Sequence, residues 1–220
     1  MKLVKPKFII ETPYPTMGMD MLKRIEKAGR TCYKSEGKIS DTSAVKFVEM
    51  IIKDGHHSVL EHESVSVRFI CDRGVTHEIV RHRIASYSQE STRYCNYSGD
   101  RFGNELSFIE PCFFGFDVTN VVDDNALDWE KRTVLVDTLK VIEKAYMKLI
   151  ELKASPQEAR YLLPNGTKTE IMMTANLREW RHFFTLRTST KAHPQMREVA
   201  IPLLNAFKNF IPVVFDNITY

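Results

Sequence analysis

Residues 81–94 have the sequence RHRIASYSQESTRY, in which Arg81-His82-Arg83 precedes a segment rich in hydroxyl and amide side chains. The planar guanidinium of arginine pairs with two oxygens of a phosphate or carboxylate, and hydroxyl and backbone N–H groups of a polar loop add further donors. The stretch therefore predicts a site for one or more phosphate groups. The alternative is that Arg81 and Arg83 are solvated charges that favour the negative end of a helix.

Short strands are expected on both sides of this stretch. Residues 63–70 alternate, with Val65, Val67 and Phe69 on one face, which is typical of a half-buried strand. Further short strands are expected at residues 8–10, 106–109 and 171–173. Residues 86–101 are too rich in Ser, Tyr, Gln and Asn to form a core element.

Helices are expected at residues 17–30, 40–54 and 73–84 on the basis of apolar spacing and end signals. Ser40 is the expected cap of the second helix, Ala44, Val48 and Ile51 belong to its buried stripe, and Gly55 supplies its left-handed stop.

The longest helix is expected to begin at Asp123 or Asp124 and to run to about Leu152. It is amphipathic, and its apolar face contains Val134, Val141, Ala145, Leu149 and Leu152.

Three helix starts follow the long helix. Ser155 and Glu158 form a capping box, and Asn176 caps a helix with Glu179 at its third position that ends near Arg187. The last helix starts at His193-Pro194, and Pro202 should kink or break it. Together these elements predict an α+β fold, a single domain over residues 1–220, with a mixed or antiparallel sheet flanked by helices. The chain has no dinucleotide fingerprint and no Walker loop, so a nucleotide would need another binding device.

Composition excludes several classes of protein. The formal charge is only +3, which demands no nucleic-acid partner, and no apolar run resembles a signal peptide or a membrane span. The four cysteines form no C-x-x-C pair, which disfavours a zinc ribbon. We therefore expect reduced thiols in a cytoplasmic protein that binds neither nucleic acid nor membrane.

Four ordered blocks resemble one known family, the flavin-dependent thymidylate synthases. Its signature is Arg-His-Arg, seven residues and Ser, which matches Arg81 to Arg83 followed by Ser91. The other similar blocks are Gly55-His56-His57-Ser58-Val59-Leu60-Glu61-His62, Ala159-Arg160-Tyr161-Leu162-Leu163-Pro164, and Asn176-Leu177-Arg178 with Leu186-Arg187. Four blocks at compatible spacing are far more specific than one short motif.

The resemblance implies two groups of binding residues. The residues implied to bind FAD are Ser58, Arg81, His82, Arg83, Gln89, Asn176, Arg178 and His182. Those implied to contact dUMP are Glu78, Arg81, Gln89, Glu90, Ser91, Thr92, Arg93, Arg160 and Arg187. Arg187 is the implied catalytic residue, because a guanidinium against the uracil would stabilise negative charge at N3.

The implied reaction is reductive methylation of dUMP to dTMP. FAD carries hydride from NADPH, 5,10-methylenetetrahydrofolate supplies the carbon, and tetrahydrofolate is released. The resemblance also implies a homotetramer with active sites shared between subunits, no metal, and Ser91 as a binding group rather than a nucleophile.

Several positions depart from the family pattern. Glu78 stands where the family often has Gln, and a carboxylate beside a phosphate or a uracil carbonyl is unfavourable. Gln89 stands where many members have Glu, and His182 stands where Asn is frequent, although it still donates a hydrogen bond. The contact of Thr92 is expected through its backbone.

Three alternatives remain open at this point. A metal hydrolase would use the dense group of His56, His57, Glu61, His62, His77, Glu78 and His82, but His77 and His82 are five residues apart and not on one helix face. A second type of thymidylate synthase uses a Pro-Cys nucleophile, which Pro111-Cys112 would supply. A nucleic-acid-binding module would use a basic, aromatic surface of Arg81, Arg83, Arg93, Arg178, Arg181, Arg187, Tyr87, Tyr94 and Tyr97.

Overall fold

A computed structural model describes residues 1–13, 17–116 and 126–220, and its chain divides into two compact units. The first unit contains residues 1–7, 70–79 and 89–171, and the second contains residues 8–69, 80–88 and 172–220. The expectation of a single domain stays a prediction. The start of the longest helix at Asp123 or Asp124 lies outside the described residues.

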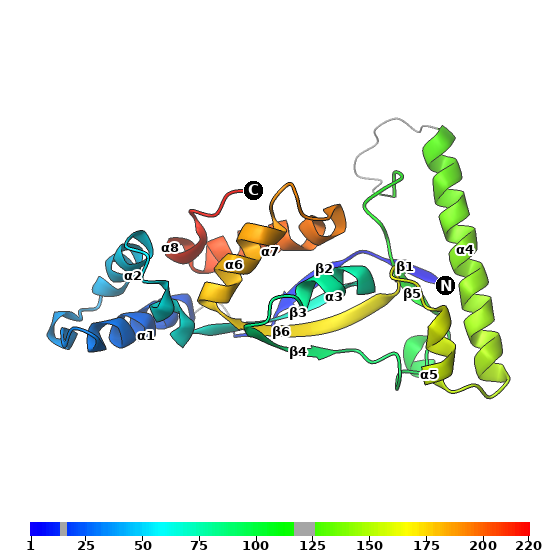
Figure 1. The fold of residues 1–220 in the computed structure, drawn as a ribbon, viewed down its shortest axis with the longest axis horizontal. Coiled ribbons are helices and arrows are strands. Elements are labelled where there is room, and N and C mark those ends of the chain that lie inside the picture. Colours follow the sequence, from blue (N-terminus) through cyan, green and yellow to red (C-terminus); the bar gives the residue numbers. More distant parts are fainter. Residues whose placement is uncertain (14–16, 117–125) are drawn as a thin grey trace. The chain divides into compact units, whose positions relative to one another are not determined.

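The main sheet has four strands in the order β2-β3-β6-β4, as the ribbon shows (Figure 1). The strands are β2 (Lys7–Ile10), β3 (Ser64–Asp72), β4 (Ala85–Gln89) and β6 (Lys168–Asn176). In β3, Val65, Val67 and Phe69 are fully buried, which confirms the predicted alternation. A separate parallel pair joins β1 (Lys2–Val4) to β5 (Ser107–Ile109), and β1 was not predicted.

The second unit is built around aromatic side chains. Helices α6 (Leu177–Arg187) and α7 (Pro194–Phe210) carry Trp180, Phe184 and Phe207, whose ring centroids lie 5.1–5.7 Å apart. The indole Nε1 of Trp180 donates to the carbonyl of Val65 at 3.0 Å, so α6 is fixed to β3. This core holds α6 rigidly, and α6 carries several of the candidate functional side chains.

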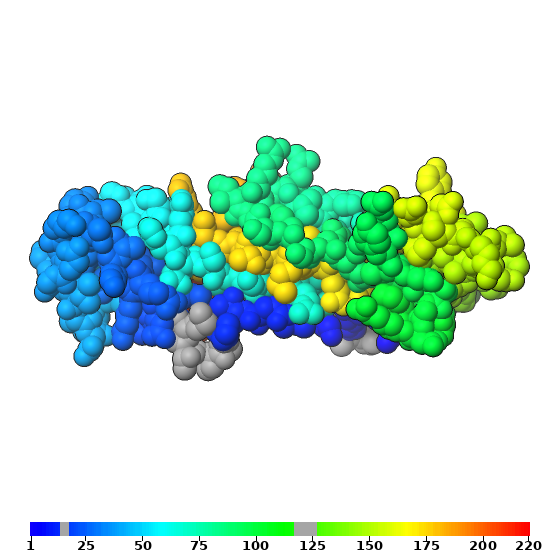
Figure 2. All heavy atoms as spheres, turned by 90° about the horizontal axis from the view of Figure 1, so that it is seen from below, coloured from blue at the N-terminus to red at the C-terminus, as the bar shows by residue number. Residues whose placement is uncertain are grey.

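Helices α1 (Met17–Thr31) and α2 (Ser43–Lys53) pack on each other in the same unit, and their blue surfaces adjoin in the space-filling view (Figure 2). Ala44, Val48 and Ile51 of α2 are buried as predicted, but the helix starts three residues after Ser40. Gly55 has φ of +76°, which confirms the left-handed stop. A short helix, α8 (Pro212–Phe215), follows α7.

In the first unit, α4 (Ala126–Glu151) packs on a core of its own. The predicted apolar face is buried only in part, because Leu149 packs against the core whereas Val134 and Val141 are 67% and 65% exposed. The buried residues of α4 are Leu139 and Tyr146, which pack with Phe108. The helix has apolar residues on more than one side, so spacing alone did not select the face.

Two further elements differ from the prediction around the Arg-His-Arg stretch. Helix α3 (Arg73–Ile79) ends well before residue 84, because the chain turns to bury His82. Ala85 to Gln89 then forms β4, a half-exposed edge strand, where only a polar stretch was expected. Strand β6 is longer than the predicted residues 171–173, because Thr169 and Ala175 continue its buried alternation.

Three helix ends agree with the sequence. Asn176 accepts a hydrogen bond from the Glu179 N–H at 2.8 Å, and His193 caps α7. The Ser155 N–H donates to Glu158 at 2.7 Å, at the start of α5 (Pro156–Ala159). Of the expected kink or break at Pro202, the break does not occur, because α7 continues through this residue; the buried side chains of Val199, Leu203 and Phe207 hold one face of the helix in the core.

Candidate functional site

Arg81, His82 and Arg83 lie in the turn between α3 and β4, and they point in different directions. His82 is 3% exposed, whereas Arg81 and Arg83 are both exposed. The two guanidinium groups are therefore accessible to an anion. The imidazole between them belongs to the interior of the second unit.

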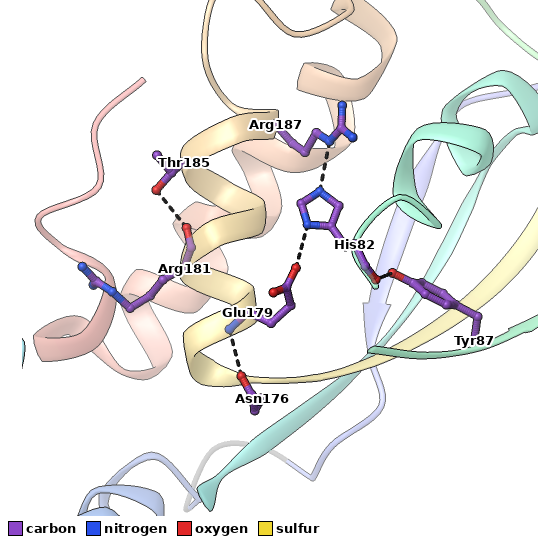
Figure 3. Close-up of polar contacts among 7 residues, drawn as sticks. All are labelled: His82, Tyr87, Asn176, Glu179, Arg181, Thr185 and Arg187. Atoms are coloured by element: carbon purple, nitrogen blue, oxygen red, sulfur yellow. Dashed lines mark hydrogen bonds and ion pairs between the residues drawn. The ribbon is translucent and has the colours of Figure 1, made fainter. Parts of the chain in front are cut away.

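The imidazole of His82 joins two residues of α6 (Figure 3). Its Nδ1 lies 2.8 Å from Oε1 of Glu179, and its Nε2 accepts a hydrogen bond from Nε of Arg187 at 3.1 Å. Glu179 is 7% exposed, so this is a buried network. The Tyr87 hydroxyl donates to the backbone carbonyl of His82 at 2.6 Å, which fixes the turn from the side of β4.

The environment of His82 favours its neutral form. Burial, foremost, and the positive charge of Arg187 hold the pKa of His82 below its usual 6.5, although the hydrogen bond to Glu179 acts in the opposite direction. Burial of the Tyr87 side chain, together with the Glu179 charge, raises the pKa of Tyr87 to about 12. Both groups are therefore uncharged at neutral pH.

His82, Glu179 and His182 are the group of possible metal ligands found among the described residues, with ligand atoms within 4.8 Å of one another. Except for His82, they are not the residues that the metal-hydrolase alternative would use. The permanently charged guanidinium of Arg187 donates to His82 Nε2 and would oppose a cation beside the same ring. We interpret His82 and Glu179 as parts of a hydrogen-bonded network with Arg187 rather than as a metal centre.

A cavity of about 550 Å³ in the second unit brings together three of the residues implied to bind FAD. Asn176, Arg178 and His182 line it, which confirms that Arg178 and His182 share a helix face. Ile84, directly after Arg81 to Arg83, also lines it. The N–H groups of Leu177 and Glu179 donate to Glu63 and Asn176, so the cavity's donors for an anion include the side chains of Arg178 and His182.

Ser58 lies in a different cavity of the same unit, of about 370 Å³. Its other lining residues include Cys32, which directly follows α1, Phe47 and Met50 on α2, and Val59. This cavity is mostly apolar, which suits an aromatic ring more than a phosphate.

In the first unit, the side chains of Gln89 and Glu90 are held by the protein itself. Gln89 donates to the hydroxyl of Thr76 at 3.0 Å. Glu90 accepts from the Tyr97 hydroxyl at 2.7 Å and pairs with Lys168 at 3.1 Å. These contacts fix the first two residues of the segment Gln89 to Arg93. The Glu90 carboxylate is one of the groups that hold this segment in place.

The rest of that segment is more accessible. Arg93 is exposed and its Nε donates to Gln157 at 3.2 Å, while its backbone N–H donates to Ser91 Oγ at 3.3 Å. Thr92 is 6% exposed, so its side chain faces inward. Arg160, at the end of α5, is exposed, and Glu78 is half-buried on α3.

One of the alternative functions, the nucleic-acid-binding module, loses support from these positions. Tyr97 is 6% exposed and bonded to Glu90, so it cannot stack on a base at the surface. Its pKa is raised by burial first and by Glu90 second. Cys112 is exposed, and the four cysteines form no disulfide with one another. In the described part of the chain, no helix has the length and apolar character to cross a membrane.

Sequence reasoning missed the role of Glu179, which it identified only as the third residue of a helix. His82 and Glu179 are 97 residues apart, so no local pattern links them. The available signal was a carboxylate in the first turn of α6, one turn before His182 and two turns before Arg187.

The family model described as thymidylate synthase complementing protein matches residues 17–213. The flavin-dependent thymidylate synthase of Geobacter sulfurreducens is 35% identical over 196 residues, which cover 86% of this chain and 78% of the relative. That of Mycobacterium avium is 35% identical over 198 residues, covering 87% and 77%.

Two solved structures share the fold. The UMP/dUMP methylase PolB from Streptomyces cacaoi, bound with 5-Br dUMP, superposes with a TM-score of 0.77 at 22% identity, over 98% of this chain and 96% of that one. The flavin-dependent thymidylate synthase of Helicobacter pylori, complexed with FAD and dUMP, gives a TM-score of 0.71 at 24% identity, over 97% and 100%.

The α+β fold class is thereby confirmed, with parallel strands in β1–β5 and an antiparallel bridge between Phe108 and Thr167. The family model matches residues 17–213, a range that contains all four blocks, including the one with the Arg-His-Arg signature, and the sequence relatives also cover most of the chain. The chain belongs to the thymidylate synthase complementing protein family, the family of the flavin-dependent thymidylate synthases.

Proposed function

We propose that this protein converts dUMP to dTMP by reductive methylation, with FAD as hydride carrier, NADPH as reductant and 5,10-methylenetetrahydrofolate as carbon donor. Tetrahydrofolate is the second product. The observation that carries the proposal is the family match over residues 17–213, which includes the complete Arg-His-Arg and Ser91 signature. FAD, when bound, supplies the hydride transfer; the chain's own residues bind, orient and polarise.

The second unit offers a donor set that fits FAD. Arg178 and His182 face the same cavity of about 550 Å³ and would hold the anionic part of the cofactor. Asn176 would add an amide, and Arg81 and Arg83 are exposed on the neighbouring turn. Ser58 would contact the cofactor from its apolar cavity. His82 is buried, so its contribution would be made through the residues that it orients.

The segment Gln89 to Arg93 would bind the dUMP phosphate. Ser91 and Arg93 supply a hydroxyl and a guanidinium, Thr92 contributes its backbone because its side chain is buried, and Arg160 adds an exposed positive charge. Gln89 would contact both FAD and dUMP, and Glu90 would act by supporting the segment. Glu78 would turn its carboxylate away from the oxygens of the nucleotide.

Arg187 would lie against the uracil ring and stabilise the negative charge that develops at N3. A guanidinium stays protonated throughout, so this role is electrostatic and not that of a base. Arg81 would also approach the nucleotide. Ser91 serves as a binding group in this scheme, with no covalent bond to the pyrimidine.

We also propose a homotetramer with shared active sites and a cytoplasmic location. The exposed apolar side chains of Val134 and Val141 on α4 support an assembly that covers them. Light scattering on the eluting protein measures the assembly directly. A monomer that is fully active would rule out shared sites.

Purified protein should be yellow, or become yellow on addition of FAD, and should oxidise NADPH in a dUMP-dependent manner when methylenetetrahydrofolate is present. Formation of dTMP is measured by chromatography. A well-folded protein that neither binds FAD nor forms dTMP would overturn the proposal.

A further inference from the structure

We infer that Glu179 is a positioning residue, which acts through His82 to fix the guanidinium of Arg187. This inference rests on the proposed function, because that function gives Arg187 its place against the uracil ring. The three side chains form one continuous chain of contacts, from Glu179 Oε1 to His82 Nδ1 at 2.8 Å and from His82 Nε2 to Arg187 Nε at 3.1 Å (Figure 3).

The geometry determines which nitrogen of His82 carries the proton. Arginine has donors and no acceptor, so Arg187 Nε must donate and His82 Nε2 must accept. The remaining proton of a neutral imidazole is then on Nδ1, where it is donated to the Glu179 carboxylate. The network therefore requires a neutral His82 with hydrogen on Nδ1, facing the Glu179 oxygen.

The carboxylate end of this chain is anchored by the start of α6. The backbone N–H of Glu179 donates to the Asn176 side chain at 2.8 Å, so the cap of the helix also fixes the residue that orients His82. The ring of Phe183 packs on the imidazole with 4.9 Å between centroids, and Tyr87 holds the His82 carbonyl. These contacts leave the imidazole little freedom to rotate.

Holding Nε of Arg187 fixes the plane of its guanidinium, and with it the directions in which the terminal N–H groups donate. Arg187 is the last residue of α6 and only half-buried, so its long side chain would otherwise sample many rotamers. A displacement of about 1 Å in a positioning contact costs up to about 100-fold in rate. Glu179 therefore contributes to turnover through Arg187, from a position that also lines the cavity of about 550 Å³.

Protonation of His82 would disrupt this arrangement. It would place an N–H on Nε2 against the N–H of Arg187, so that two donors face each other. The charged or titratable groups that face His82 are Glu179, Arg187 and His182 on α6, with Tyr87 bonded to its backbone from β4. Loss of activity at acid pH would therefore follow the titration of His82.

The tautomer can be measured without any assay of activity. In protein labelled with ¹⁵N-histidine, the resonances of the His82 ring, assigned by comparison with His82→Gln, should show hydrogen on Nδ1 and a bare Nε2 at pH 8. Free histidine prefers the opposite tautomer, so the result is specific to the network. A proton on Nε2 would overturn the inference, whatever reaction the protein catalyses.

Two substitutions test the catalytic consequence. Glu179→Ala removes the acceptor and should lower kcat about 10- to 100-fold, with KM for dUMP and FAD content within about twofold of wild type. Glu179→Gln keeps an acceptor oxygen, so kcat should recover to within a few-fold. The carboxylate that raises the pKa of His82 is gone in Glu179→Gln. The fall of kcat at low pH, here called the acid limb of the rate profile, should therefore move to lower pH in this variant.

The matched control is Glu11→Gln, which removes the charge of another carboxylate in the second unit, paired with Arg68 at 2.6 Å. It should leave both kcat and the acid limb unchanged.

If wild type forms no dTMP, the proposed function fails and the tautomer still tests the network. If wild type is active and Glu179→Ala has the same kcat, the inference alone fails. If Glu179→Ala does not fold, the acid limb of Glu179→Gln decides, and an unshifted limb contradicts the inference.

Discussion

Arg178 and Glu61, 117 residues apart in the sequence, form an ion pair of 2.6 Å between two side chains that line the same cavity. The pair is exposed to solvent, with 54% and 43% of the side chains accessible, so its energy is small. An anionic ligand in this cavity therefore competes with a carboxylate for Arg178.

This competition predicts opposite effects of two substitutions. Arg178→Ala should weaken FAD binding about 10-fold or more, because a charge-assisted hydrogen bond is lost. Glu61→Gln should strengthen it by up to about fivefold, since an exposed ion pair is worth about 0.2–1 kcal/mol. Quenching of flavin fluorescence during titration measures both, and equal weakening by both variants would show that Glu61 itself binds the cofactor.

Arg187→Ala should separate cofactor binding from turnover. The variant should keep its flavin, whereas dUMP-dependent oxidation of NADPH should fall about 100- to 1,000-fold, the size of effect seen when one donor to a developing negative charge is removed. Lys at this position keeps the charge but loses the Nε–H that bonds His82, so Arg187→Lys should restore activity only in part. A colourless Arg187→Ala protein would place this residue in the flavin site instead.

The lowered pKa of His82 predicts how stability depends on pH. The unfolded chain binds the proton more tightly than the folded one, so the unfolding free energy rises with pH and is fully gained above about 6.5. It is lost as the pH falls below 6.5 toward the folded pKa. Urea unfolding of wild type and His82→Gln between pH 5 and 8 measures this, and a stability difference that is constant over the range would contradict it.

Cys112→Ala should leave kcat and flavin content unchanged within about twofold. Cys112 is exposed, and the proposed reaction uses no enzyme thiol. A folded Cys112→Ala protein without turnover would support a Pro-Cys nucleophile. Cys32→Ala is the informative companion, because Cys32 lines the same cavity as Ser58.

Truncating the aromatic core should cost far more stability than any of these changes. Phe207→Ala removes a fully buried ring that packs on Trp180 and Phe184, and should lower the unfolding free energy by about 3–5 kcal/mol. Tyr94→Ala removes a side chain that is 76% exposed and serves as the control. Thermal unfolding of the two variants measures the difference.

The sequence predicted the helices that have strong local signals. Asn176 with Glu179 defined the start of α6, and Gly55 defined the end of α2. It also predicted β3, because the alternation of Val65, Val67 and Phe69 has one interpretation. In each case the signal lies within a few residues of the element that it describes.

The errors arose where distant contacts decide the structure. Helix α3 stops at Ile79 because His82 turns inward to meet Glu179, and β4 forms because β6 offers it a neighbouring strand. On α4, Leu139 and Tyr146 are buried because Phe108 packs against them, which no spacing rule on α4 reveals. The same limit hid the pairing of Glu90 with Lys168.

The alternation of exposure along Arg81, His82 and Arg83 separates two kinds of mutational phenotype within one tripeptide. Substitutions at the outer arginines should leave the amount of protein in a cell unchanged and reduce only its catalytic output. Substitutions at the central imidazole should also reduce the amount, because a buried network is left unsatisfied and degradation removes the destabilised chain. A scan that scores cellular abundance and growth separately would therefore assign different roles to three adjacent residues of the same motif.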